Sequence, residues 1–190
     1  MWVYPPAPEP EPEPVDFWNT RPAVAHIHQF ARARRVGPWA LFGCILVRVM
    51  AATTPKICLP PLIGGPVSLN SFVAIVSDTG DGKGVAESAA LDAIDCASTP
   101  VLGPGSGEGL SDLFVYREKD ETVQHATAVI LSAAEVDTLG ALKMRPSSTL
   151  LPELRKGWMG EQLGFAYRDP AKRLTVERHA YRLCLLMGLQ

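Results

Sequence analysis

The sequence lacks a dominant charge, and this absence limits the partners that the chain as a whole attracts. Eighteen lysines and arginines stand against 20 aspartates and glutamates, which gives a net charge of -2. A protein so close to neutrality exerts no strong overall field on nucleic acid or on an anionic membrane. Any such contact is therefore expected to be local.

Long hydrophobic runs and paired cysteines are also missing. The apolar segment at residues 39–47 ends at Arg48, whereas a membrane-spanning helix needs about 20 apolar residues. The cysteines are Cys44, Cys58, Cys96 and Cys184. None belongs to a CxxC pair, which argues against a cysteine metal site or a disulfide framework. We therefore expect a cytoplasmic protein without a membrane segment.

The length and composition favour one globular domain preceded by a tail. The chain has 190 residues, of which 47% are hydrophobic, enough to bury one core. Residues 1–15 alternate proline and glutamate after a short start that has neither a basic nor an apolar run, so we expect a disordered tail and no secretory signal. Residues 16–54 are predicted to be a helical region, and residues 55–190 to be the core.

Hydrophobic spacing predicts an α/β fold with a mostly parallel sheet. Helical periodicity marks two neighbouring segments at residues 20–35 and 38–52, which we expect to form a helical hairpin. Continuous apolar runs, typical of strands covered on both faces, occupy residues 71–76, 127–131 and 181–187. Helical stretches are expected between them, at residues 84–97, 133–142 and 148–158. This alternation is typical of a sheet flanked by helices. A small hairpin is expected at residues 163–176.

A glycine-rich turn after the first of these strands is the most informative motif. The turn and the residues beside it are Ser77, Asp78, Thr79, Gly80, Asp81, Gly82, Lys83, Gly84 and Val85. Glycines let backbone N–H groups converge on an anion, and the following helix adds partial positive charge. Lys83 is placed to reach terminal phosphates. The strand, turn and helix together predict a polyphosphate site; the alternative is an ordinary turn whose lysine faces water.

These residues resemble the Walker A motif of P-loop NTPases, GxxxxGK followed by serine or threonine. Ser77 stands in place of the first glycine, and Gly84 in place of the hydroxyl residue that ligates magnesium. The longer stretch from residue 17 to residue 190 resembles the RecA-like ATPase domains of phage and mobile-element replication proteins. This resemblance implies a RecA-like P-loop sheet, ATP and Mg²⁺ as cofactors, and a motor or loading role on DNA.

Acidic candidates for the phosphate site follow two of the predicted strands. By the resemblance, Ser132 stands where P-loop NTPases usually have the Walker B aspartate, at the end of a neighbouring strand. Glu135 is the nearest substitute, although it also suits the first turn of a helix. Glu108, in a glycine-rich connection after a short strand near residue 101, is the other catalytic candidate; the alternative is an incidental loop acid. We expect Mg²⁺ to bind through the nucleotide, with Ser132 or Glu135 contributing through water.

The end of the sequence carries one further candidate. Gln190 resembles a sensor residue at the tip of a strand next to the phosphates. RecA-like sheets normally continue beyond this point, and the hypothesis that follows is that the chain is the N-terminal portion of a longer ancestor.

Three functions follow from these observations. The first is an ATP-binding P-loop NTPase whose hydrolysis is linked to DNA replication or helicase-type work of a mobile element. The second is a weakly active or inactive nucleotide-binding remnant or interaction module, because Gly84 and Ser132 remove two metal ligands. The third is a DNA-binding module that acts through the arginines of the helical hairpin, with a vestigial P-loop. Expected partners are the nucleotide, single-stranded DNA and a second copy of the chain.

Overall fold

The computed structural model describes most of the chain after its proline-rich start. The described residues are 17–62, 64–76, 83–96, 99–119, 121–133, 135, 140–141, 144, 148–169 and 173–189. The predicted tail at residues 1–15 lies outside them. So does most of the predicted helix at residues 133–142.

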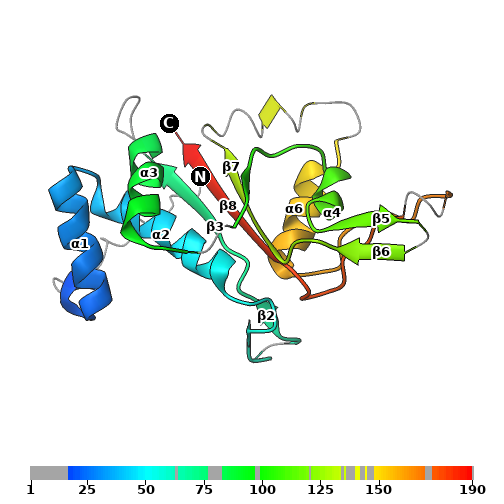
Figure 1. Cartoon of the computed structure of the whole chain (residues 1–190), viewed down its shortest axis with the longest axis horizontal. Coiled ribbons are helices and arrows are strands. Elements are labelled where there is room, and N and C mark those ends of the chain that lie inside the picture. The colour runs from blue at the N-terminus through cyan, green and yellow to red at the C-terminus, as the bar shows by residue number, and fades with distance from the viewer. Residues whose placement is uncertain are drawn as a thin grey trace, which may run out of the picture.

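A sheet of four parallel strands forms the centre of the molecule, in the order β3-β8-β7-β4 (Figure 1). The strands are β3 (Phe72–Val76), β4 (Val101–Leu102), β7 (Ala128–Ala133) and β8 (Arg182–Leu189). Because β8 pairs with both β3 and β7, the last strand in the chain lies inside the sheet. The prediction of a parallel sheet within an α/β fold is confirmed.

Helices cover both faces of this sheet (Figure 1). One face carries α2 (Pro38–Ala52) and α3 (Lys83–Ala93), and α1 (Pro22–Arg34) packs against these two helices. The other carries α4 (Gly109–Asp112), α6 (Leu150–Met159) and the hairpin of β5 (Val115–Glu118) with β6 (Glu121–Gln124). A short 3₁₀ helix, η1 (Phe17–Asn19), precedes α1, and an antiparallel pair, β1 (Cys58–Leu59) with β2 (Val67–Ser68), follows α2.

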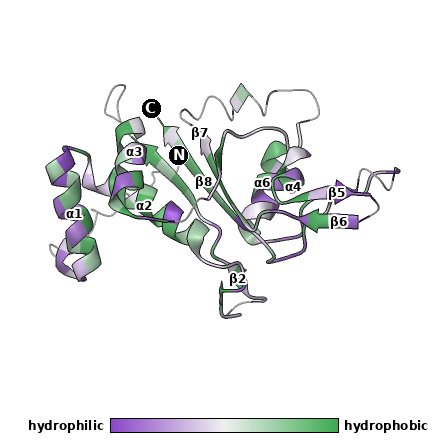
Figure 2. Ribbon diagram, viewed as in Figure 1, coloured by the Kyte–Doolittle hydropathy of each residue, from purple (hydrophilic) through white to green (hydrophobic). Residues whose placement is uncertain are grey.

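Alternation along the central strands divides the core into two clusters. Leu183 and Leu185 of β8 pack with α4 and α6, whereas Cys184 and Leu186 pack with α1, α2 and α3. Successive side chains of a strand point to opposite faces, so a strand covered on both faces reads as continuously apolar. Figure 2 shows this concentration of hydrophobic residues along the sheet, in contrast to the more hydrophilic α1.

Several element boundaries differ from the predicted ones. The strand predicted to end at residue 131 continues to Ala133, so Ser132 lies within β7 rather than after it. The helix predicted to end at residue 97 ends at Ala93. In the described part of the hairpin predicted at residues 163–176, there is one antiparallel bridge, between Leu163 and Val176.

A buried arginine fixes the amino end of β8 to the end of α2. Arg182 has no exposed surface, and its guanidinium donates to the carbonyl oxygens of Thr53 (3.2 Å), Thr54 (2.7 Å) and Ile57 (2.8 Å). These carbonyls belong to the segment that follows α2, which ends at Ala52. Arg182 therefore joins the segment after α2 to the start of β8 through three hydrogen bonds.

Candidate functional site

The frame predicted around the phosphate-binding turn is present. Strand β3 ends at Val76, and α3 begins at Lys83. Ser77, Asp78, Thr79, Gly80, Asp81 and Gly82 lie outside the described residues, as do the side chain of Lys83 and all of Gln190. Val76 lies opposite Leu189 in the parallel register. The sequence positions of the turn and of Gln190 therefore both follow directly on paired strand ends.

A small cavity opens at this carboxyl edge of the sheet, with room for about 70 Å³. It is lined by residues from α3 and from three strands: Ile75, Gly84, Glu87, Ser132, Ala133, Leu186, Met187 and Gly188. Ligands of open α/β sheets bind outside the carboxyl ends of the strands. The cavity therefore lies where this architecture places ligands, beside the first turns of α3.

The hydroxyl of Ser132 and the carboxylate of Glu87 meet in this cavity. Ser132 Oγ donates to Glu87 Oε2 over 3.2 Å, and both side chains are half-buried. Glu87 is four residues after Lys83 and three after Gly84 on α3, a spacing that places residues on one helix face. Gly84 adds open space, because a Cβ atom built there would meet no other atom within 4 Å.

Glu87 is not among the acids that the sequence motif singles out. The sequence does contain a signal for Glu87. It is four residues after Lys83, the candidate phosphate-binding lysine, and residues four apart on a helix share a face. The motif instead directs attention to the end of a neighbouring strand. The structure brings an acid to that strand end from α3, through the hydrogen bond with Ser132.

The charge of Glu87 also affects the pKa of Cys44, a buried thiol of α2. Burial raises the pKa of Cys44 from 9.0 to about 12, the negative charge of Glu87 also acts to raise it, and Arg48 opposes both effects. Cys44 is 1% exposed. Cys44 does not line the cavity and belongs to the apolar cluster that includes residues of α2 and α3.

Glu135 does not line the cavity. It lies two residues beyond the end of β7, and it is exposed. The structure therefore places this predicted acid near the correct strand but outside the cavity that Ser132 and Glu87 share.

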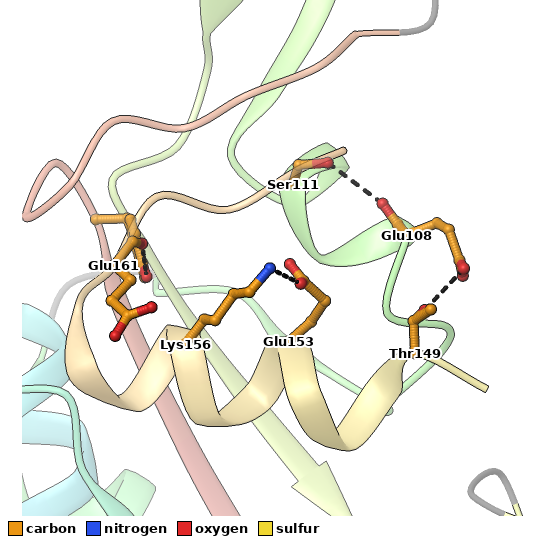
Figure 3. Close-up of polar contacts among 7 residues, drawn as sticks. Glu108, Ser111, Thr149, Glu153, Lys156 and Glu161 are labelled. Atoms are coloured by element: carbon orange, nitrogen blue, oxygen red, sulfur yellow. Dashed lines mark hydrogen bonds and ion pairs between the residues drawn. The ribbon is translucent and has the colours of Figure 1, made fainter. Parts of the chain in front are cut away.

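Glu108 lies away from the cavity, on the side of the sheet that carries α4 and α6 (Figure 3). Its Oε1 accepts a hydrogen bond from Thr149 Oγ1 over 2.7 Å, and its backbone carbonyl accepts one from Ser111 Oγ over 3.2 Å. The bond from Thr149 is the main cause that lowers the pKa of this exposed carboxyl. Glu108 connects the starts of α4 and α6.

Figure 3 also shows a second acid near Glu108, on α6. Glu153 is 1% exposed and pairs with Lys156 one turn later, with 2.5 Å between Oε1 and Nζ. Lys156 lies over the ring of Phe165, 5.7 Å from its centroid. This pair belongs to the packing of α6.

The arginines predicted to face DNA are partly engaged within the protein. Arg34 pairs with Asp92 of α3 at 3.0 Å and lies over the ring of Phe30. Arg35 ends α1 in a left-handed conformation, with φ of 56°. The end of α1 is therefore joined to α3, the helix that borders the cavity.

Comparison with known proteins identifies no relative: no family model, no curated protein and no solved structure matches the chain. Within the described part of the chain, no helix is long and apolar enough to cross a membrane. The same part contains no cluster of three or more histidine, cysteine or acidic side chains that could hold a metal ion. The four cysteines are free thiols.

Proposed function

We propose that the chain binds ATP at the carboxyl edge of its sheet and hydrolyses it slowly. The phosphates would lie against residues 77–84, with Lys83 opposite their negative charge and the first turn of α3 beneath them. The observation that carries this proposal is the cavity between β3, β7, β8 and α3, which Gly84 of the motif lines. RecA-like P-loop organisation and a role in DNA replication belong to the same proposal and rest on the resemblance, and a cytoplasmic location rests on the unpaired cysteines and the missing secretory signal.

The strand order supports this assignment. Strand β8 lies between β3, which precedes the motif, and β7, which carries Ser132. The carboxyl ends of all three strands border one cavity. A group bound there touches residues that are 48 positions apart in the sequence, Gly84 and Ser132.

Magnesium, the cation that accompanies ATP, suits the residues at this edge. Mg²⁺ prefers oxygen ligands and is usually held by one or two carboxylates together with substrate phosphates and water. The carboxylate of Glu87 and the hydroxyl of Ser132 are such oxygens. When bound, the ion would neutralise charge on the phosphate oxygens.

Slow turnover is expected because this edge of the sheet lacks two metal ligands that P-loop NTPases usually have. Gly84 carries no hydroxyl, and Ser132 carries no carboxylate. Neither Glu135 nor Glu108 lines the cavity, so neither of the predicted catalytic acids lies beside it. These observations favour a protein that binds nucleotide more effectively than it hydrolyses it, the second of the functions that the sequence suggests.

The test is ATP binding and turnover by the full chain and by Lys83→Ala. Losing a charged hydrogen bond to phosphate costs about 1.5–3 kcal/mol, which weakens binding about tenfold to a hundredfold. Lys56→Ala, at an exposed lysine after α2, is the matched control and is expected to bind ATP like the wild type. Equal affinity in the wild type and Lys83→Ala would refute the proposal. Single-stranded DNA added to each assay tests the DNA role through its effect on turnover.

A further inference from the structure

We infer that Glu87 supplies the carboxylate for the divalent cation of the bound nucleotide, and that Ser132 positions it. This inference rests on the proposed function and names the residue on which cation binding depends. It moves the acid of the site from the end of a strand to the first turns of α3. Glu87 is not part of the Walker A motif, and it is not among the acids predicted from the resemblance, Glu135 and Glu108.

The need for such an acid follows from the two missing ligands. A cation bound with nucleotide requires protein oxygen atoms close to the phosphates. Gly84 offers no side chain, and the hydroxyl of Ser132 is neutral. Glu87 is the only acidic residue among the described residues that line the cavity. It therefore provides the negative charge that these two positions lack.

The geometry of Glu87 leaves it able to bind a cation. An ionised carboxylate has two oxygen atoms with about four acceptor positions. The hydrogen bond from Ser132 occupies one position on Oε2. The side chain is half-buried and lines the cavity rather than being enclosed by the core. A single carboxylate is also consistent with the absence of any three-residue metal cluster in the described residues, because phosphates and water complete the coordination of Mg²⁺.

Ser132 acts on the cation through Glu87. Hydrogen bonds to a ligating carboxylate fix its orientation, and loss of such a partner lowers metal affinity by about 10- to 100-fold. The 3.2 Å separation between Ser132 Oγ and Glu87 Oε2 also shows that a carboxylate at residue 132 would reach the same part of the cavity. Residue 132 is therefore a place from which the acid can be restored.

The test measures ATP affinity of the full chain by calorimetry in Mg²⁺ and in EDTA. For the wild type we expect tighter binding in Mg²⁺ than in EDTA, and the ratio of these two affinities is called the Mg²⁺ advantage. In Glu87→Gln, which preserves the size of the side chain and an acceptor for Ser132, we expect this Mg²⁺ advantage to shrink about tenfold. Affinity in EDTA should be unchanged or higher, because a negative charge near the phosphates is removed. Asp92→Asn, which removes an exposed carboxylate further along α3, is the matched control and should keep the wild-type advantage.

A rescue variant separates a metal role from a structural one. Adding Ser132→Asp to Glu87→Gln returns a carboxylate to the cavity, and we expect it to recover most of the Mg²⁺ advantage. An unchanged advantage in Glu87→Gln would overturn this inference while leaving the proposed function intact. An advantage lost in Glu87→Gln and not recovered by Ser132→Asp would also count against it. Absence of ATP binding by the wild type in both buffers would overturn the proposed function and this inference together.

Discussion

The two ends of β8 hold charged side chains in opposite ways. At the amino end, Arg182 is fully buried and donates to three backbone carbonyls. Beside the carboxyl end, Glu87 is half-buried, receives one hydrogen bond from Ser132 and lines a cavity. The first charge is held by three hydrogen bonds to backbone carbonyls of its own chain, whereas the second has acceptor positions to spare.

This difference separates a structural charge from one available to a ligand. Removing a fully buried charged side chain takes several hydrogen bonds away from its partners and disturbs the packing around it. Removing a half-buried charge exposes its partner to water, which replaces the lost bond. Substitutions at the amino end should therefore affect stability, and substitutions at the carboxyl end should mainly affect binding.

The largest loss of stability is expected at the amino end. Arg182→Met removes the three hydrogen bonds to the carbonyls of Thr53, Thr54 and Ile57, and we expect it to lower the free energy of unfolding by about 3 kcal/mol. Urea denaturation measures this loss. Arg178→Met, at an exposed arginine in the turn before β8, should change stability by less than about 0.5 kcal/mol. Similar losses in both variants would remove the structural role assigned to Arg182.

A smaller effect per pH unit is expected from Cys44, a buried thiol of α2. Cys44 has a pKa of about 12 in the folded chain, raised from 9.0 mainly by burial. Between these values the unfolded chain loses the proton and the folded chain keeps it, so rising pH favours unfolding. One such group lowers the free energy of unfolding by about 1.4 kcal/mol for each pH unit in this range. Stability of the wild type should therefore fall above pH 9.

The control for this effect is the slope of stability against pH. Cys44→Ala removes the thiol, so the fall in the free energy of unfolding above pH 9 should be shallower than in the wild type. Cys184 and Tyr181 also have raised pKa values because they are buried, and they account for the slope that remains. Parallel slopes in the two proteins would contradict the assigned environment of Cys44.

The smallest effect on stability is expected at the carboxyl end. Ser132→Ala removes one hydrogen bond to a half-buried carboxylate, and we expect a loss of about 1 kcal/mol or less. The same urea measurement applies. A loss equal to that of Arg182→Met would show that the carboxyl end contributes to stability no less than the amino end.

Much of the framework was predictable because its signals are local. The apolar run of β8 and the periodicity of α2 depend on neighbouring residues, and the predicted bounds of α2, 38–52, match the structure. The placement of β3 before the glycine-rich motif and α3 after it was predictable for the same reason. Strands covered on both faces, with helices between them, indicate a parallel sheet directly.

The β5–β6 hairpin was not predicted, because its turn lacks the usual signal. Tight hairpin turns favour Asn-Gly or Asp-Gly, whereas Lys119 adopts φ of 53° in this one. The contact between Glu87 and Ser132 was missed for another reason. It joins residues 45 positions apart, and only the packing of α3 against the carboxyl ends of the strands brings them together.

Hydrogen exchange of the full chain, with and without ATP and Mg²⁺, tests most directly whether the carboxyl edge binds nucleotide. Amides that contact phosphate should exchange more slowly, so protection is expected in the first turn of α3, at residues 83–87, and at the carboxyl end of β8. The β5–β6 hairpin should be unaffected. Protection confined to the hairpin or to α1, or no protection at saturating ATP, would contradict a nucleotide site at this edge.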